Sequence, residues 1–423
     1  MGIEMIKTSG LKAYEHVEYL ADTIGPRPSG SKRALSAAEY ICERFEEYGL
    51  EVQREPLRPI VYAHDRSYLE IPTPRPMKVD AIPLMFSGTT GKKASFGDLI
   101  YLRDRPADRL SRMDLSGKVA LLEEPRGNPF IAIPRLVRAA MEANAVGVII
   151  HARSGGPRNF SLELGKVYPP AVFVSSECAF LLLERLASGN RRVGISVSAR
   201  AIESKTSQNI RATLGSKEWT DKVVICSHYD TVIGSPGAND NGSGVACVLE
   251  AARALAEAGR KGNVEFVAFD AEEPHPYCLG SRHYVEVHGV HAGANPAVIK
   301  CAIAIDMVGV GVKANNMPSL KALYRDGYYR GGLAQTSKRL DSAILRVAGE
   351  LGVALRRLEE VGLSDHVPFL RAGIDASLLR WMDDPFYHTP DDRVINVDPN
   401  KLEIMSSIAA NSAMVLSKTG RWA

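Results

Sequence analysis

The stretch from residue 223 to residue 241 constrains the fold more than any other part of the chain. It opens with an apolar run at residues 223–227, which is typical of a buried strand. His228 and Asp230 follow at once, and a glycine-rich turn then leads to Asp240. Apolar residues at helical spacing come next. The stretch therefore predicts a strand, a polar loop and a helix, with three metal-type ligands on the loop.

Strand and helix alternate from residue 205 onward. Residues 264–269 and 302–305 are short apolar runs typical of strands, and residues 337–351 carry apolar side chains on one helical face. Alternating strands and helices form a largely parallel sheet that is covered on both faces. In such sheets, ligands bind beyond the carboxyl ends of the strands. We therefore expect an α/β fold with a mixed, largely parallel sheet and a site at one edge.

The length of 423 residues favours more than one domain. Residues 1–65 contain two expected helices and a strand. Between about residues 66 and 200, short strands alternate with helices, and no cluster of titratable side chains occurs. We expect residues 66–200 to form an inserted, β-rich, non-catalytic domain that restricts access. Residues 1–65 and 201–423 would then form the catalytic domain.

Side chains capable of metal chemistry follow four separate predicted strands. They are His228 with Asp230, Glu272 with Glu273, Asp306, and Tyr387 with His388, and Asp240 lies on the loop after the first strand. Each alone would be explained as a helix cap, a turn residue or solvated surface. Carboxylates buried together repel one another and need a compensating positive charge. Too few lysines and arginines accompany these loops, whereas divalent metal ions would supply that charge.

Two histidines and three carboxylates form a ligand set that suits zinc or a neighbouring first-row metal. If one carboxylate bridges two ions, five side chains give each ion three ligands. Positions then stay open for a water molecule and a substrate, which is the arrangement of a catalytic site. A sixth acidic side chain would be available as a general base.

Residues 205–417 resemble the family of co-catalytic zinc aminopeptidases and glutamate carboxypeptidases. The motifs that carry this resemblance are His-Tyr-Asp at 228–230, Pro-Gly-Ala-Asn-Asp-Asn-Gly-Ser-Gly at 236–244, Glu-Glu at 272–273, Leu-Gly-Ser at 279–281, Asp-Met at 306–307, Ser-Asp-His at 364–366 and Tyr-His-Thr-Pro-Asp-Asp at 387–392. Residues 66–200 resemble the protease-associated domain that is inserted in many members. Leu-Ser-Gly-Lys-Val at 115–119 and Ala-Val-Gly-Val-Ile-Ile at 145–150 carry that second resemblance.

The resemblance implies two zinc ions per chain, which cobalt or manganese could replace. It implies that Asp240 bridges both ions, that His228 and Asp306 complete one site, and that Glu273 and His388 complete the other. It also implies that Glu272 is the general acid/base and that Asp230 orients His228. Tyr387 would either donate to the oxyanion or pack beside its loop. For Asp365 and His366 we expect helix capping.

One segment departs from the family pattern. Residues 274–278, Pro-His-Pro-Tyr-Cys, stand where many members have a short glycine-containing link between the glutamate pair and Leu-Gly-Ser. In the family this rim faces the substrate pocket, so the departure concerns specificity rather than metal chemistry. We interpret His275 as a rim residue and not as an additional ligand.

The expected function is that of a zinc-dependent exopeptidase acting on peptides, and we favour an aminopeptidase. A free α-amine needs carboxylates near the metals, which Glu272 and Glu273 provide. A terminal carboxylate needs a basic residue, and the motif loops contain none apart from Arg282 and Arg380. Alternatives are a carboxypeptidase or dipeptidase, a non-catalytic receptor-like scaffold and a glutaminyl-cyclase-like acyltransferase. The complete ligand set argues against the last two.

Composition bears on partners and location. The net charge of +3 is spread along the chain and gives no argument for nucleic acid or an anionic membrane. No apolar run has the length of a membrane span, and residues 1–10 lack the apolar region of a signal peptide. The six cysteines show no paired spacing, as in reduced proteins. We therefore expect a cytoplasmic protein, and assembly into a homo-oligomer is left open.

Overall fold

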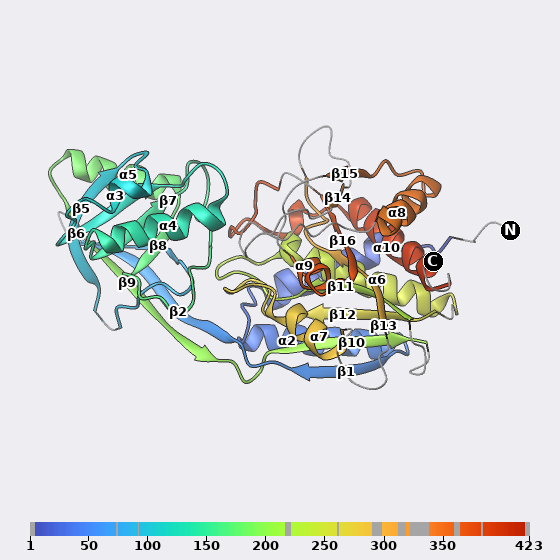
Figure 1. Ribbon diagram of the computed structural model, residues 1–423. Coiled ribbons are helices and arrows are strands. Elements are labelled where there is room, and N and C mark those ends of the chain that lie inside the picture. Colours follow the sequence, from blue (N-terminus) through green and yellow to red (C-terminus); the bar gives the residue numbers. More distant parts are fainter. Residues whose placement is uncertain are drawn as a thin grey trace.

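The structure is a computed structural model, and it describes residues 5–72, 75–91, 93–215, 221–259, 262–289, 298–311, 319–321, 338–358, 364–381 and 384–418. Two eight-stranded sheets organise these residues. Each sheet and its helices form one lobe, and the two lobes lie side by side (Figure 1). Within the described residues, no helix combines the length and the apolar character that a membrane span requires.

The first sheet has the order β1-β10-β12-β11-β13-β16-β14-β15. Its four central strands run parallel; they are β12 (Val264–Phe269), β11 (Asp221–His228), β13 (Val298–Ile305) and β16 (Asp375–Arg380). The outer strands are β1 (Glu51–Pro56), β10 (Gln208–Leu214), β14 (Ser319–Lys321) and β15 (Arg356–Leu358). Antiparallel pairing joins β10 to β12 and β14 to β16. The expected mixed, largely parallel sheet is confirmed.

Helices cover both faces of the first sheet. One face packs against α1 (Gly10–Glu18), the π-helix η1 (Tyr19–Ile24), α2 (Lys32–Glu47), α6 (Gly244–Glu257), α8 (Lys338–Glu350) and α10 (Pro399–Lys418). The other face packs against α7 (Leu279–His288) and α9 (His366–Arg371). Successive side chains of a strand point to opposite faces. Val223 and Ile225 of β11 therefore enter one core, and Val224 and Cys226 enter the other.

Local signals in the sequence explain where these helices begin and end. Ser31 caps the start of α2, because its Oγ accepts a hydrogen bond from the Ala34 N–H at 3.0 Å. Gly49, with a φ of +76°, follows the end of the same helix, where a left-handed residue is favourable. Asp398 Oδ1 accepts from the Asn400 N–H at 2.9 Å and so caps the start of α10.

The second sheet has the order β3-β2-β9-β5-β6-β7-β8-β4. Its strands are β2 (Ile60–Ile71), β3 (Met77–Asp80), β4 (Ile82–Pro83), β5 (Ser95–Leu102), β6 (Lys118–Glu123), β7 (Gly147–His151), β8 (Ala171–Val174) and β9 (Arg192–Glu203). Three helices accompany it, α3 (Ala107–Leu110), α4 (Pro129–Glu142) and α5 (Ser176–Ala187). The long strands β2 and β9 pair from Ile60 opposite Glu203 onward and extend toward the first lobe (Figure 1). The strands of the second sheet span the chain from Ile60 to Glu203, which includes the whole range 66–200 expected for the inserted domain.

Candidate metal centre and active site

The predicted ligands converge at the carboxyl edge of the first sheet. His228 is the last residue of β11, and the other ligands follow the remaining central strands: Glu273 after β12, Asp306 after β13 and His388 after β16. Because these strands are parallel, their carboxyl ends share one edge. Asp240 reaches the same place from the short segment η2 (Ala238–Ser243). The structure thus brings together five side chains that lie up to 160 positions apart.

The five side chains form two clusters that share Asp240. The ligand atoms of His228, Asp240 and Asp306 lie within 4.8 Å of one another, as do those of Asp240, Glu273 and His388. His228 Nε2 is 3.5 Å from Asp240 Oδ1 and 3.7 Å from Asp306 Oδ1. His388 Nε2 is 3.3 Å from both Asp240 Oδ2 and Glu273 Oε2. Each carboxylate oxygen of Asp240 therefore faces a different histidine, as a bridging ligand requires.

Unpaired oxygens in these clusters fit a bound cation. Glu273 Oε1 and Asp306 Oδ1 are buried, and the described residues offer neither of them a hydrogen-bond partner. A buried carboxylate oxygen without a partner is costly, whereas a metal ion would satisfy it. Imidazole nitrogens and carboxylate oxygens are also the donors that zinc prefers in catalytic sites. The residues therefore fit a zinc centre.

Crowding of charge shifts the protonation of the cluster. Burial raises the pKa of Glu272 well above its usual range, and the nearby carboxylates of Glu273, Asp365 and Asp306 add to that effect. Burial alone would lower the pKa of His388, but Glu273 and Asp240 raise it to about 10. A metal ligand must give up its proton, so binding of a metal here would release protons.

Both histidines are held through Nδ1, which leaves Nε2 for a metal. His228 Nδ1 donates to the carbonyl oxygen of Asp230 at 3.2 Å. His388 Nδ1 donates to the carbonyl oxygen of Asn159 at 2.7 Å, and the Asn159 N–H donates in turn to the His388 carbonyl at 3.1 Å. Such hydrogen bonds fix the tautomer and the orientation of a metal-binding imidazole.

Asp230 was expected to orient His228, and it also positions other parts of the site. Its Oδ1 lies 3.6 Å from His228 Nδ1, so the closer contact to the histidine is made by the Asp230 carbonyl. The carboxylate instead accepts hydrogen bonds from two adjacent backbone amides, Oδ1 from Glu272 at 3.1 Å and Oδ2 from Glu273 at 3.2 Å. A single side chain therefore fixes the backbone of both glutamates.

The loop that carries Asp240 is held by two residues to which the sequence analysis gave no role. Asp392 accepts from the Asn239 N–H at 2.7 Å and from the Asp240 N–H at 3.0 Å. Arg27, which is fully buried, holds the same loop from the N-terminal segment. Its guanidinium donates to the carbonyl oxygens of Tyr229 at 2.7 Å, Pro236 at 2.7 Å, Gly237 at 2.8 Å and Leu20 at 3.2 Å.

The second lobe contributes directly to the site. The cavity above the candidate metal ligands is also lined by Phe130, Tyr277, Met307, Arg380 and Tyr387. Phe130 stands at the start of α4, and its ring centroid is 5.9 Å from that of His388. Asn159, the partner of His388, belongs to the same lobe. The expectation that the insertion only restricts access is therefore too narrow, because it supports a metal-type ligand and forms one wall of the cavity.

The segment that departs from the family pattern, residues 274–278, contacts the second lobe. The His275 N–H donates to Ser161 Oγ at 2.9 Å, and His275 Nδ1 accepts from the Leu164 N–H at 3.2 Å. Tyr277 Oη donates to the Ser161 carbonyl at 3.2 Å. His275 thus faces the second lobe, and neither of the two ligand clusters includes it. The unusual sequence of this segment provides contacts between the lobes.

Two further residues of the motifs have contacts that bear on their expected roles. Asp365 precedes α9 but makes no side-chain cap; its Oδ1 accepts from Ser281 Oγ at 2.6 Å, so the capping interpretation is wrong for this residue. The bond joins the Ser-Asp-His and Leu-Gly-Ser motifs. The Tyr387 ring stacks on His388 with centroids 3.8 Å apart. Packing of Tyr387 beside its loop is thus observed.

The fold and this site define a class of protein. A largely parallel sheet with paired histidine and carboxylate clusters at its carboxyl edge is typical of metal-dependent hydrolases of the zinc-peptidase type. Comparison with known proteins identifies the family. Residues 209–413 match the profile described as Peptidase family M28, and this part of the chain belongs to that family of hydrolases.

Relatives of this chain include enzymes named for opposite peptide ends. It is 29% identical over 407 residues to aminopeptidase YwaD of Bacillus subtilis (strain 168), which covers 92% of this chain and 81% of that protein. It is 26% identical over 295 residues to carboxypeptidase Q of Bos taurus, over 66% of this chain and 61% of that protein. The solved structure of BSAP, a zinc aminopeptidase from Bacillus subtilis, matches with a TM-score of 0.77 and 26% identity, over 97% of this chain and 95% of that one.

Proposed function

We propose that this protein is a zinc-dependent aminopeptidase that binds two zinc ions and removes N-terminal residues from peptides. The observation that carries the proposal is the position of Asp240, whose two oxygens face His228 and His388 at 3.5 and 3.3 Å. The similarity to aminopeptidase YwaD and to the zinc aminopeptidase BSAP supports it. The activity on peptides follows from membership of the M28 family.

In this proposal Asp240 would be a ligand of both ions. His228 and Asp306 would complete one site, and Glu273 and His388 would complete the other. When bound, zinc ions would supply an activated water at neutral pH and polarise the carbonyl of the substrate. The hydrogen bonds from Nδ1 of each histidine keep its Nε2 directed at the site.

Glu272 serves as the general acid/base in this proposal. Its carboxylate lies beside the metal-binding side chains, within 4.8 Å of ligand atoms of His228 and Glu273. Its backbone is fixed by Asp230, and its Oε1 accepts a hydrogen bond from the Cys278 thiol at 3.4 Å. Glu272 takes a proton from the attacking water and returns it to the leaving amine. Because burial raises its pKa, the carboxylate holds that proton readily between the two steps.

In this proposal Tyr387 donates from Oη to the oxyanion that develops on the substrate carbonyl. Its ring lines the cavity and is held by stacking on His388. The preference for the amino end of a peptide rests on charge. Glu272 and Glu273 can accept hydrogen bonds from a free α-amine, whereas Arg380, the arginine that lines the cavity, lies 3.7 Å from Asp306, whose charge offsets its own.

Arg380 also favours a second candidate function. An arginine in the cavity is the group that a carboxypeptidase or dipeptidase would use to bind a terminal carboxylate. The similarity to carboxypeptidase Q points in the same direction. The two functions differ in which free chain end the enzyme requires.

Peptides blocked at one end separate these candidates. The zinc-loaded protein is incubated with an N-acetylated peptide and with a C-terminally amidated peptide of the same sequence, and the released residues are identified. We expect release of the first residue from the amidated peptide and no cleavage of the acetylated one. Release of the last residue from the acetylated peptide, with the amidated one intact, would overturn the aminopeptidase proposal. The Glu272→Gln variant controls for contaminating peptidases.

A further inference from the structure

A second cavity, of about 480 Å³, lies in the second lobe. Its walls come from residues at or just after the ends of β5, β6 and β7, from the start of α3 and from the first two turns of α4. The strands β5, β6 and β7 run parallel, so their carboxyl ends meet at this edge. Ligands of α/β sheets bind at such edges, and pockets of about 300–1,000 Å³ hold small molecules. None of the five metal-type ligands lines this cavity.

The cavity carries an excess of positive charge. Four arginines line it, Arg105, Arg126, Arg135 and Arg153, together with the acidic residues Asp104 and Glu123. Arg153 forms ion pairs with both acidic residues: its Nη1 is 2.9 Å from Glu123 Oε1, and its Nη2 is 3.6 Å from Asp104 Oδ1. The other three arginines are exposed, and within the described ranges their side chains form no ion pair.

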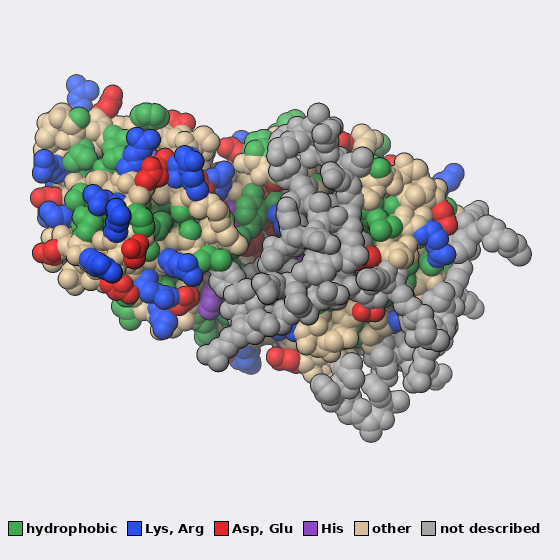
Figure 2. All heavy atoms as spheres, turned by 45° about the horizontal axis from the view of Figure 1, so that its top comes forward, with side chains coloured by type: hydrophobic (Ala, Val, Ile, Leu, Met, Phe, Trp, Pro, Cys, Tyr) green, Lys and Arg blue, Asp and Glu red, His purple; other side chains and the backbone are tan. Residues whose placement is uncertain are grey.

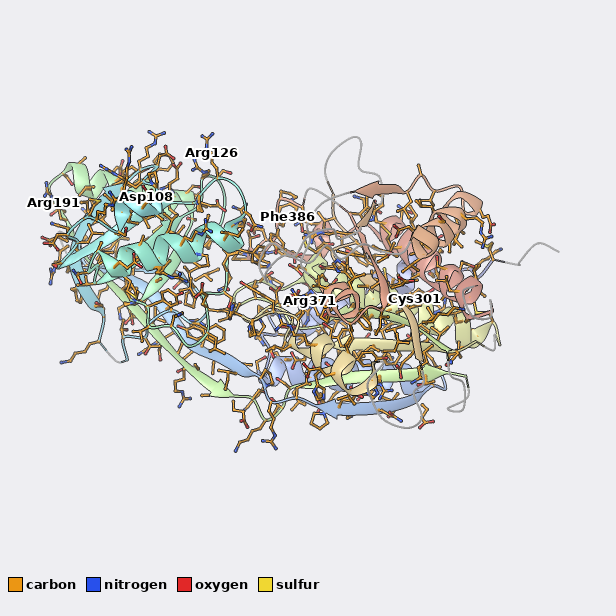
Figure 3. All side chains as sticks on the ribbon, viewed as in Figure 1. Asp108, Arg126, Arg191, Cys301, Arg371 and Phe386 are labelled. Atoms are coloured by element: carbon orange, nitrogen blue, oxygen red, sulfur yellow. The ribbon has the colours of Figure 1, made fainter. Side chains whose placement is uncertain are left out.

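The three remaining arginines surround an apolar floor. Leu102, Leu122 and Leu136 are buried beneath the cavity, and Ile131 of α4 adds to its wall. Arg126 projects from the edge of the lobe, on the loop between β6 and α4 (Figure 3). Basic side chains are also prominent over the surface of this lobe (Figure 2). A guanidinium binds a carboxylate with two parallel hydrogen bonds, and an apolar floor favours an organic body over a bare inorganic anion.

We propose that this cavity binds a small carboxylate with an apolar body, of the kind presented by a free apolar amino acid or by the C-terminal end of a peptide. The carboxylate pairs with Arg105, Arg126 and Arg135, and the apolar body covers the leucine floor. The amides at the start of α4 do not supply the donors, because Asn128 already accepts from Phe130, Ile131 and Ala132. The arginine side chains therefore carry the recognition.

The probe for this site must not suit the metal centre. The same first turn of α4 presents Phe130 to the metal-site cavity and Ile131 to the second cavity, so the two lie close together. N-acetyl-leucine lacks the free amine that the proposed aminopeptidase site recognises, and any binding of its carboxylate to Arg380 would be unchanged in variants of the second cavity. N-acetyl-leucinamide has the same body without the carboxylate, and inorganic phosphate has charge without the body.

The experiment is equilibrium binding to the full-length, zinc-loaded protein, measured by calorimetry. We expect N-acetyl-leucine to bind and N-acetyl-leucinamide and phosphate each to bind at least tenfold more weakly. A triple variant, Arg105→Gln, Arg126→Gln and Arg135→Gln, should weaken binding of N-acetyl-leucine at least tenfold. Arg191→Gln is the matched control, because Arg191 is exposed at the far end of the same lobe and does not line the cavity (Figure 3). The Arg191→Gln variant should bind N-acetyl-leucine with the same affinity as the unchanged protein.

A second variant tests the cavity rather than the charge. Ala132→Phe places a ring in the space above the floor and leaves every arginine in place, so it should also abolish binding. A blocked tripeptide with a free C-terminal leucine distinguishes the two sources of the carboxylate: binding equal to that of N-acetyl-leucine indicates a peptide end, and weaker binding indicates a free amino acid. Equal affinity for the amide, or unchanged affinity in both the triple variant and Ala132→Phe, would overturn the proposal.

Discussion

Replacement of Arg27 should damage both the stability of the first lobe and its affinity for zinc. The guanidinium is fully buried and donates to four carbonyl oxygens, three of which, on Tyr229, Pro236 and Gly237, belong to the segment that carries Asp230 and Asp240. Arg27→Met has a similar length and no donor. It removes all four hydrogen bonds, although the Gly237 and Leu20 carbonyls still accept from the Gly242 and Gly25 N–H groups, at 3.0 and 3.1 Å. It also removes a positive charge close to Asp392, Asp230 and Asp240.

The size of the effect follows from those contacts. A hydrogen bond to a charged group contributes about 1.5–3 kcal/mol, so four bonds set an upper bound of about 6–12 kcal/mol. Removing the buried charge recovers part of its desolvation cost, and the loss of one member of a buried charged network typically destabilises by about 3–5 kcal/mol. We therefore expect Arg27→Met to lower the free energy of unfolding by about 3–5 kcal/mol. Because the loop positions Asp240, a proposed ligand of both ions, zinc affinity should fall about 10–100-fold.

Guanidinium chloride unfolding measures the first quantity, and competition with a chelator measures the second. Arg27→Lys keeps the charge but offers fewer, differently placed donors, so it should fall between the unchanged protein and Arg27→Met and remains informative if the methionine variant does not fold. The exposed Arg191→Met is the control, and its stability should change by no more than about 0.5 kcal/mol. A change of under about 1 kcal/mol in Arg27→Met, with unchanged zinc affinity, would refute the reasoning.

Three further predictions concern the metal, pH and the second lobe. Chelation should abolish peptidase activity and added zinc or cobalt should restore it, as followed with an amino-acid anilide; activity in a verified metal-free preparation would contradict the metal assignment. His16, buried between the hydroxyls of Tyr40 and Tyr48, has a pKa lowered by burial to about 4. Well above pH 6.5 His16 is neutral in both the folded and the unfolded state, so it has no effect on the free energy of unfolding. As the pH falls from 6.5 to 4, only the unfolded chain readily takes up the proton, so the free energy of unfolding should fall by about 3 kcal/mol. His16→Gln should flatten that part of the curve of unfolding free energy against pH, and an unchanged slope would be inconsistent with a buried neutral histidine. Phe130→Ala should raise KM about tenfold for substrates with an apolar first residue without changing zinc content, and a loss of zinc instead would assign Phe130 a role in holding His388.

The ligand set could be predicted from the sequence because its signal is local. Each candidate ligand stands at the end of an apolar run or on the loop that follows it, and parallel strands bring such positions to one edge whatever the details of packing. His228, Glu273, Asp306 and His388 meet for this reason. The largely parallel sheet follows from the same alternation of strands and helices.

The contacts that hold the ligands could not be predicted in this way. Arg27 lies 202 positions from Tyr229 and binds its carbonyl oxygen, and Asn159 binds His388 through its own carbonyl. A backbone carbonyl is present at every position and leaves no trace in the residue types. The main contacts of Asp230 could not be predicted for the same reason, because they are the backbone amides of Glu272 and Glu273.

The part played by the second lobe was also hidden in the sequence. Residues 66–200 contribute to the site through the apolar ring of Phe130 and the backbone carbonyl of Asn159, and neither group belongs to a titratable cluster. One local signal in this lobe is the N-cap of α5: a serine stands at position 175, and its Oγ accepts a hydrogen bond from the Cys178 N–H. The pairing of β2 with β9 joins segments separated by more than a hundred residues, which local patterns do not specify.

The most direct test of the proposed mechanism compares Glu272→Gln with Glu273→Gln, measuring zinc content and kcat for both. Glu273 Oε2 lies 3.3 Å from His388 Nε2 among the ligands, whereas Glu272 Oε1 accepts from the Cys278 thiol. Glu272→Gln keeps the size of the side chain but cannot accept the proton. It should retain two zinc ions per chain and lose about 10²–10⁴-fold in kcat with little change in KM. Glu273→Gln should lose zinc from one site. Loss of zinc in the Glu272 variant, with full zinc content in the Glu273 variant, would contradict the assignment of the two glutamates.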